Sequence, residues 1–458
     1  MLSCANLPSV TAVTSSGRSI MWFRRDLRLA DNPALATAAD HGEVIPLFII
    51  DPALWDRAGD VRRTYLVRSL QALDDSLDGA LHIAHGKPTE VLHDLAKSLD
   101  VSMITAAADF APYGRTRDLE VEAAGLPINW VGSPYAVAPG RVRKPDGTQY
   151  RVYTPFYKAW FAHGWRAPVA VPDARYRRPT EELRKFPTAQ LPEHVTLPEV
   201  GEAAALKLWQ HFRGDVLARY DEDRNLADRA GTSSLSAALR WGEIHPRTLL
   251  AELDGTKAQE TFRKEIAWRE FYADVLWHEP RTAREYYKEA FTRMRYDDPG
   301  EKFQAWCEGR TGFPFVDAGM RQLLAEGWMH NRLRMVVASF LVKDLHIEWQ
   351  HGARHFMKWL RDGDVASNSH GWQWTAGCGT DAAPYFRIFN PTEQGRKFDP
   401  EGDYIRHYVP ELRHLDATVI HEPWAVLDGL AHGYPERIVD HGVERTEALA
   451  RLAEISGS

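Results

Sequence analysis

Short apolar runs alternate with amphipathic stretches through the first third of the chain. The apolar runs have the length and composition of buried strands, and they fall at 19–23, 43–51, 81–86, 101–106 and 127–131. The stretches between them are helical in pattern, as at 60–77, 88–99 and 116–124. Because strand and helix alternate, we predict a parallel sheet with helices on both of its faces.

Beyond residue 139 the strand pattern fades. Residues 140–205 are rich in Pro and Arg and weakly periodic, which predicts a long surface connector with a short apolar helix at 153–161. Amphipathic helices follow, and one is predicted over 332–349, where Leu333, Val337, Phe340, Leu341, Leu345 and Trp349 recur at three- and four-residue steps. We therefore predict an α/β plus all-α fold. It comprises a disordered tail at 1–17, a Rossmann-like parallel-sheet domain at 18–139, the connector at 140–205 and a helical domain at 206–458.

Composition narrows the class of protein. The chain has 458 residues, of which 44% are hydrophobic and 26% charged, as in ordinary soluble proteins. No apolar run is long enough for a membrane span, and residues 1–17 are a poor secretory signal. Cys4, Cys307 and Cys378 form no CxxC, which argues against a disulfide scaffold or a four-cysteine iron–sulfur cluster. We expect a cytoplasmic protein.

Charge and histidine content limit the candidate ligands. The net charge is −7, so any contact with nucleic acid must come from a local basic patch. His351 and His355 stand four residues apart, but no third ligand suggests itself near them, and we predict no metal site.

Tryptophan is concentrated late in the chain, at Trp328, Trp349, Trp359, Trp372 and Trp374. Core packing is the usual role of Trp at helical spacing. However, residues two apart on a helix point to nearly opposite sides, which applies to the arginines of NRLRM and to the last two of these Trp. With the DGD turn nearby, the pattern favours a wall that has a cofactor on one side and a second ligand on the other.

Three further stretches have two interpretations each. WFRRDLRLADNPAL stands where a GxGxxG would identify a dinucleotide fold, and it predicts a loop with a salt-bridged Arg–Asp cluster. The hydroxyl residues of 231–236 can cap the helix that follows, and the same geometry can bind phosphate. Glu265, Trp268, Arg269 and Tyr272 share one helical face, either as a Glu–Arg pair over a core Trp or as a carboxyl that an aromatic pocket keeps protonated.

Five motifs together identify a family resemblance: MWFRRDLRLADNPAL, GTSSLSAALRWGEIHPR, AWREFY, GWMHNRLRM and GWQWTAG followed by GTDAAPYFRIFNP. From about Ser19 to about Tyr434 the chain resembles the DNA photolyase and cryptochrome family, and most of all its class I cyclobutane pyrimidine dimer photolyases. The resemblance implies a monomer that binds reduced FAD non-covalently and repairs such dimers in ultraviolet-damaged DNA under light. Two alternatives remain: a cryptochrome-like photoreceptor without repair activity, and a nucleotide-binding module that uses only the α/β domain.

The resemblance also implies the flavin contacts. Tyr220 and the segment Thr232, Ser233, Ser234, Leu235 and Ser236 would hold the diphosphate, Phe262 would contact the flavin, and Arg269 would support cofactor or phosphate. Arg334 would pair with Asp362 over the isoalloxazine, while Asp364 would accept from a ring N–H. Asn368 would face flavin N5. An amide there adds no charge against an anionic reduced flavin, which favours repair over signalling. Ser369 and His370 depart from the usual pattern beside it.

For the lesion, the resemblance implies Glu265 as hydrogen-bond and proton partner, with Trp268 and Trp374 stacked on the bases. Asn331 and Met335 would line the same pocket, and Asn331 favours cyclobutane dimers because enzymes for the six-four photoproduct carry His there. Arg224, Arg332 and Gln394 are candidates for DNA backbone contacts.

Two accessory features follow from the same comparison. Trp372 and Trp349 match an electron-transfer chain that photoreduces the flavin, and Tyr296 falls where a third Trp is usual. Since a tyrosyl radical normally loses its proton, we expect altered photoactivation but unaltered repair from pre-reduced flavin. In that family the α/β domain can hold an antenna pigment, and an empty pigment site is the alternative. DFAPYGRTRD favours 8-hydroxy-deazaflavin over methenyltetrahydrofolate, although Ala111 replaces the acidic residue of that motif.

Overall fold

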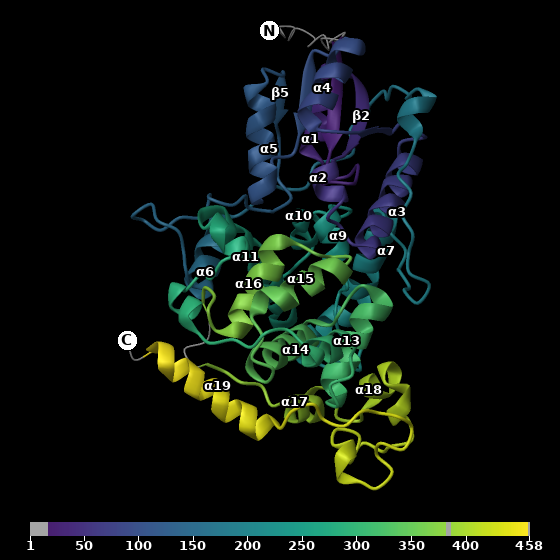
Figure 1. Ribbon diagram of the computed structural model, residues 1–458. Helices are drawn as coiled ribbons and strands as arrows, with labels where there is room; N and C mark the ends of the chain where they lie inside the picture. Colours follow the sequence, from purple (N-terminus) through teal and green to yellow (C-terminus); the bar gives the residue numbers. More distant parts are fainter. Residues whose placement is uncertain (1–16, 382–385, 457–458) are drawn as a thin grey trace, which may run out of the picture.

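The computed structural model describes residues 17–381 and 386–456. Five parallel strands form one sheet in its N-terminal part, residues 17–130, which we call the α/β half (Figure 1). The helices from residue 202 onward form the helical half. The sheet order is β3-β2-β1-β4-β5, with β1 at Gly17–Phe23, β2 at Gly42–Ile50, β3 at His82–His85, β4 at Met103–Ala106 and β5 at Ile128–Trp130. The predicted parallel sheet is confirmed, and every strand begins and ends within two residues of its predicted bounds. Of the predicted tail, only Gly17 lies among the described residues.

Helices cover both faces of the sheet because its side chains alternate between them. Met21 and Phe23 of β1 pack with Leu70 and other residues of α3, whereas Ile20 and Trp22 face the cluster that includes Leu92 of α4. The helices of this half are α1 at Pro33–His41, α2 at Pro52–Trp55, α3 at Asp60–Ser76, α4 at Pro88–Ser98 and α5 at Pro112–Ala123.

The connector runs over both halves. It contains the expected short helix, α6 at Tyr153–His163, and a 3-10 turn at Glu181–Arg184. Val44 exchanges backbone hydrogen bonds with Arg175 and Arg177, alongside the part of β2 that short β3 does not reach. The connector therefore covers an otherwise open strand edge.

Helices make up the rest of the chain. They are α7 at Glu202–His211, α8 at Tyr220–Asp223, α9 at Ser236–Trp241, α10 at Pro246–Ala251, α11 at Lys257–His278, α12 at Glu301–Cys307, α13 at Pro314–Glu326, α14 at Asn331–Lys343, α15 at Trp349–Trp359, α16 at Val365–Ala376, α17 at Pro391–Phe398, α18 at Asp403–Tyr408 and α19 at His441–Ser456. In the described part of the chain, no helix is both long and apolar enough to cross a bilayer.

The single helix predicted over 332–349 is wrong. The structure has two helices, α14 and α15, with a turn between them in which His346 takes a positive φ of 54°. His346 pairs with Glu444 at 2.8 Å, and Asp344 with His441 at 2.5 Å, so contacts to α19 hold the turn. The apolar spacing continued through the turn because Leu345 is buried as well.

Three glycines bring the two halves into close contact. A Cβ on Gly59 would lie 1.8 Å from the carbonyl oxygen of Lys358, and one on Gly242 would lie 1.9 Å from that of Arg25. On Gly327 it would lie 2.3 Å from a methyl carbon of Val61. The junction thus depends on positions without a side chain.

Candidate functional site

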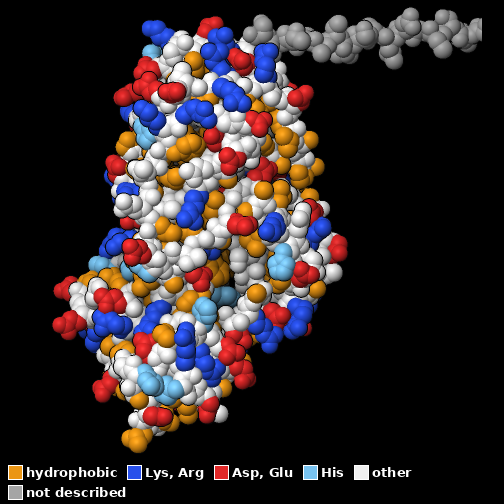
Figure 2. All heavy atoms as spheres, turned by 90° about the vertical axis from the view of Figure 1, so that its right-hand side faces the viewer, with side chains coloured by type: hydrophobic (Ala, Val, Ile, Leu, Met, Phe, Trp, Pro, Cys, Tyr) orange, Lys and Arg blue, Asp and Glu red, His pale blue; other side chains and the backbone are white. Residues whose placement is uncertain are grey.

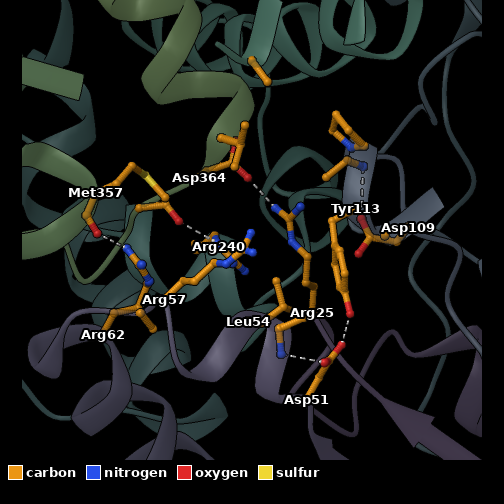
Figure 3. A pocket seen from close by; sticks show the side chains of 18 of the residues that line it. Arg25, Asp51, Leu54, Arg57, Arg62, Asp109, Tyr113, Arg240, Met357 and Asp364 are labelled. Carbon is orange, nitrogen blue, oxygen red and sulfur yellow. Dashed lines mark hydrogen bonds and ion pairs between the residues drawn. The ribbon is translucent and has the colours of Figure 1, made fainter. Parts of the chain in front are cut away.

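A cavity of about 730 Å³ lies between the two halves (Figure 3). Its α/β wall consists of the last residues of β1 and β2, the residues that follow β1, β2 and β4, and part of α3. It lies at the carboxyl edge of the sheet, where strand order reverses between β1 and β4. Its helical wall comes from α9, residues 280–285, α15 and the start of α16. Ligands of open parallel sheets bind at this edge and switch point, so the cavity is a candidate binding site.

Ten arginines and four carboxylates line this cavity. Two ion pairs join residues of the lining: Arg25 donates to Asp364 at 2.7 Å, and Arg117 lies 3.3 Å from Asp109. Buried Arg62 donates instead to the carbonyl of Met357. Burial opposes ionisation of Asp109, but Arg117 and two further arginines outweigh it and lower its pKa to about 2. Arg57 and Arg354 are exposed, and neither has an ion pair among the described residues. They are available to an anionic group.

The predicted Arg–Asp cluster of WFRRDLRLADNPAL exists, but most of its pairs are with distant residues. Arg24 pairs with Asp118 at 2.5 Å and Arg25 with Asp364, while Asp31 accepts from Arg247 at 2.6 Å. The loop joins the halves rather than closing on itself.

Among the predicted cofactor residues, Asp364 and Asn368 line this cavity. Asp364 caps α16 by accepting from the N–H of Ser367 at 3.0 Å, and Arg25 occupies its other oxygen. Asn368 donates its amide to the carbonyl of Ala353 at 3.1 Å, which leaves its own carbonyl oxygen as the acceptor. Tyr220 and the 232–236 segment lie outside the cavity lining.

Capping by hydroxyl side chains at 231–236 was the wrong local interpretation. Leu235 is the N-cap of α9, and no side chain caps this end. Ser234 holds a positive φ of 51°, and a Cβ on Gly231 would lie 2.7 Å from the carbonyl oxygen of Asp223. Strained backbone of this kind clusters at ligand-binding turns, and uncapped N–H groups suit a phosphate, so this segment fits the FAD diphosphate.

Arg334 and Asp362 form the predicted ion pair, at 2.7 Å. Burial opposes ionisation of Asp362, but the charge and hydrogen bond of Arg334 outweigh it and lower the pKa of this carboxyl. Its second oxygen, Oδ1, is buried with no hydrogen-bond partner among the described residues. Trp328 donates to the hydroxyl of Ser236 at 3.1 Å, which brings the 231–236 segment beside α14. An unsatisfied carboxylate oxygen here fits a polar cofactor.

A polar cluster forms where α8, α11 and α14 meet. Arg224 pairs with Glu265 at 2.7 Å, and Arg332 donates to Asn225 at 2.7 Å. Burial raises the pKa of Glu265, and the charge of Arg224 opposes that rise. Asn331 is exposed at the start of α14, and Met335 follows one turn later on the same face. Glu265 therefore pairs across elements, not with Arg269 along its own helix.

Aromatic rings border this cluster. Trp268 stacks on Tyr153 of α6 with 3.7 Å between ring centroids, so the connector supplies part of the wall. Tyr220 meets Phe262 edge to face at 5.5 Å. Trp374 is half-buried on the side of α16 opposite the buried Trp372, as the two-residue spacing predicts.

Arg269 and Gln394 differ in whether their hydrogen-bonding groups have partners within the protein. Arg269 donates to the carbonyls of Pro134 and Leu239, each at 3.0 Å, which ties α11 to the chain before it. The amide oxygen of Gln394 is buried without a partner in the part of the chain that is described. The amide oxygen of Gln394 can thus accept a hydrogen bond from a ligand, whereas both terminal nitrogens of Arg269 already donate within the protein.

Sequence reasoning missed one residue, Arg387, of the segment after residue 385. Arg387 is exposed, and its charge acts on Arg332. Buried Lys343 donates to the carbonyl of Arg387, and Ser339 accepts from the N–H of Phe389 at 3.3 Å. The RIFNP motif identified this segment, but only the fold places Arg387 near Arg332 of the polar cluster. Residues 382–385 lie outside the described part.

Ser369 and His370 have structural partners. Ser369 donates to the carbonyl of Ala283 at 2.9 Å, and the ring of His370 stacks on Tyr272 at 5.6 Å. Burial lowers the pKa of His370 to about 4, so this imidazole is neutral at neutral pH.

Surface charge and metal ligands add two observations. Acidic and basic side chains are interspersed over the face in Figure 2, which suits a local rather than a broad basic patch. Within 17–381 and 386–456, no group of three or more His, Cys, Asp or Glu is arranged to hold a metal. The rings of His351 and His355 pack instead against Phe303 and Trp306.

Two family models match this chain. One described as the FAD-binding domain of DNA photolyase covers residues 262–454, and one described as DNA photolyase covers 19–173. The chain is 39% identical over 473 residues to the deoxyribodipyrimidine photo-lyase of Escherichia coli, covering 94% of this chain and 97% of that one. It is 38% identical over 468 residues to that of Agrobacterium fabrum, covering 95% and 98%. The chain therefore belongs to the DNA photolyase family.

Solved structures of photolyases and a cryptochrome are similar to this chain over nearly its full length. A class III photolyase from Agrobacterium tumefaciens superposes with a TM-score of 0.88 at 36% identity, over 98% of this chain and all of that one. A cryptochrome from Synechocystis has a TM-score of 0.85 at 27% identity, over 95% and 99%. An archaeal photolyase from Sulfolobus tokodaii, described with two FAD molecules, has a TM-score of 0.82 at 28% identity, over 95% and 100%.

Proposed function

We propose that this flavoprotein enzyme repairs cyclobutane pyrimidine dimers in DNA under light. The observation that carries the proposal is the convergence of half-buried Glu265, Arg224 and Arg332 from three helices beside exposed Asn331. Reduced FAD, when bound, supplies the electron that opens the cyclobutane ring. The residues of the chain supply binding, orientation and a proton.

Each side chain of the cluster has a role in this proposal. The extruded base pair stacks against Trp268 and Trp374, at a cost of a few kcal/mol that is least for a poorly stacked lesion. Glu265, whose pKa burial raises, donates a hydrogen bond to a base carbonyl. The exposed amide of Asn331 serves a second polar atom of the lesion, and Met335 fills the apolar wall.

Flavin and DNA contacts complete the proposed site. Thr232, Ser233, Ser234, Leu235, Ser236 and Tyr220 would hold the diphosphate, supported by the uncapped start of α9. Arg334 and Asp362 would lie over the ring system, with Asp364, Asn368, Phe262 and Arg269 around it. Arg224, Arg332 and Gln394 would hold the DNA backbone.

The test is repair of an oligonucleotide with one thymine dimer by protein whose flavin is chemically reduced. We expect repair in blue light and none in the dark. Glu265→Gln should lower the repair rate, whereas Glu260→Gln should not, because Glu260 is on the same helix and, among the described residues, its one ion pair is with Lys264 at 2.9 Å. An intact lesion after illumination of fully reduced protein contradicts the proposal.

A cryptochrome-like photoreceptor is the second candidate, favoured by the structural likeness to the Synechocystis cryptochrome. It would reduce its flavin in light and leave the same oligonucleotide unrepaired. The class I assignment is part of our proposal and rests on the motif resemblance. Asn331 favours cyclobutane dimers over the six-four photoproduct, and Asn368 favours repair over signalling.

We also propose that the interdomain cavity holds an antenna pigment on its α/β side, whereas Asp364 and Asn368 of its helical wall face the flavin. Among antenna pigments, 8-hydroxy-deazaflavin is favoured over methenyltetrahydrofolate. The position of the cavity at the strand ends supports a planar ligand, and exposed Arg57 and Arg354 suit an anionic tail. The absorption spectrum of pigment extracted from the purified protein separates the two compounds. A spectrum of FAD alone from protein made in a host that supplies both pigments contradicts this assignment.

Monomeric state and cytoplasmic location are proposals as well. Cys307 and Cys378 are both free and buried, which supports a reducing compartment. Size-exclusion chromatography with light scattering tests the monomer.

A further inference from the structure

The buried aromatic residues continue past Trp349 to a tyrosine that the sequence did not single out. Tyr286 meets Trp349 edge to face with 6.2 Å between ring centroids. It stacks on Tyr296 at 6.4 Å, with the ring planes 16° apart. Tyr286 is 5% exposed, whereas Tyr296 is half-buried. The rings thus form a contiguous series from Trp349 through Tyr286 to Tyr296.

Trp372 reaches this series through α15. A Cβ placed on Gly352, one turn after Trp349, would lie 2.1 Å from a ring carbon of Trp372. Trp372 therefore packs directly on the helix that carries Trp349. It also meets Trp306 edge to face at 6.1 Å, which is an alternative branch.

Proton acceptors differ sharply along these rings. The indole N–H groups of Trp372 and Trp349 are buried and have no hydrogen-bond partner among the described residues. That of Trp306 donates to the carbonyl of Val337 at 3.0 Å, and an amide carbonyl is a very weak base. The Tyr286 hydroxyl donates to Oε1 of Glu348 at 2.7 Å. Among these rings, Tyr286 is the one that donates a hydrogen bond to a carboxylate.

We propose that Tyr286, with Glu348 as its proton acceptor, is the residue at which the electron-transfer chain of this protein is trapped. The inference rests on the proposed function, because illuminated oxidised FAD, when bound, withdraws one electron from the aromatic chain. Oxidised Trp349 takes an electron from Tyr286, and the phenolic proton moves to Glu348. The products are neutral Trp349, a neutral tyrosyl radical and a protonated Glu348, so charge and protons balance.

Trapping follows from the position of the proton. Return of the electron to Tyr286 requires the proton to come back from Glu348 as well, which slows recombination. Glu348 is half-buried and can release its proton to water. A thiol in solution then restores Tyr286 by way of half-buried Tyr296, supplying one electron and one proton.

The experiment uses the full-length protein with oxidised FAD and no DNA. A light pulse is followed by time-resolved absorption and electron paramagnetic resonance, with ring-deuterated tyrosine to identify a tyrosyl signal. We expect a neutral tyrosyl radical in the wild type and its loss in Tyr286→Phe. Glu348→Gln should slow its formation and abolish the slowing that D₂O causes in the wild type. Tyr287→Phe is the matched control, since the neighbouring ring packs against a different core cluster.

Two results overturn the proposal: a full tyrosyl signal in Tyr286→Phe, or a wild type in which only a tryptophan radical forms. Trp306→Phe should leave the tyrosyl signal intact, and its loss there would assign the route to the other branch. Dimer repair is assayed separately with chemically reduced flavin, and Tyr286→Phe should then match the wild type. Failure of repair in both proteins would contradict the proposed function while leaving the radical result to stand.

Discussion

Arg25 and Asp364 are 339 residues apart in sequence, yet the guanidinium of Arg25 donates to the carboxylate of Asp364 at 2.7 Å. Arg25 follows β1, and Asp364 is the N-cap of α16, the helix that carries Asn368 and Trp372. The pair therefore fixes the start of the candidate flavin helix to the end of the central strand.

Breaking this ion pair should destabilise the protein. Both side chains are 13% exposed, and loss of one partner from a buried pair costs about 3 kcal/mol because the other charge stays buried. We expect Arg25→Met to lower the free energy of unfolding by that amount in urea titrations. Lys87→Met, which removes a half-exposed pair with Glu120, should change it by less than about 1 kcal/mol. Equal losses in both variants would contradict a structural role for the Arg25–Asp364 pair.

Gly231→Ala should reduce FAD binding. The added methyl would lie 2.7 Å from the backbone oxygen of Asp223, so the 231–236 segment must shift. Flavin fluorescence titration of the apoprotein measures the affinity. Gly214→Ala is the control, since nothing lies within 4 Å of its Cβ. Unchanged affinity in Gly231→Ala would separate this segment from the flavin.

Arg387 should contribute more to DNA affinity than Arg224. Arg387 is exposed, whereas Arg224 must leave Glu265 before it can meet a phosphate. We expect Arg387→Gln to reduce the slope of log affinity against log salt by about 0.9, the value for one phosphate contact on duplex DNA. Fluorescence anisotropy with dimer-containing DNA gives the slope, and Arg295→Gln beside α19 serves as control. A larger effect from Arg224→Gln would reverse this order.

Lys343 should make stability depend on alkaline pH. Burial lowers its pKa to about 7, whereas the pKa of a lysine in the unfolded chain is about 10.4. Between these values the unfolded chain binds more protons, so the destabilisation caused by burying this amine falls as pH rises, by up to about 1.4 kcal/mol per pH unit. Lys343→Met should lose this pH dependence in urea titrations between pH 7 and 9. Lys302→Met, at an exposed site, is the control; parallel curves for Lys343→Met and wild type would contradict the prediction.

The sequence predicted the sheet well because each of its strands is a short apolar run between turn signals, and all five lie within two residues of expectation. It failed at residues 344–348, where side-chain pairs to α19 end a helix that the apolar spacing continues. Local pattern carries no information on such distant partners.

The candidate site residues likewise include some that the sequence predicted correctly and some whose partners only the fold reveals. The pairing of Arg334 with Asp362 was implied by the family resemblance, and the ion pair is present. Glu265 was assigned by its helical face, yet its partner Arg224 comes from another element. Tyr286 and Lys343 had no distinguishing sequence context, because their significance comes from Trp349 and Arg387 across the fold.

The glycines at the junction limit how photolyase halves can be recombined. Gly59, Gly242 and Gly327 each admit an atom of the opposite half at a distance that any larger residue would obstruct. A donor α/β segment grafted onto this helical segment would dock only if both surfaces keep their bare positions. Exchange of α/β segments between relatives therefore requires that the contacting surfaces of both halves be transferred as a matched set.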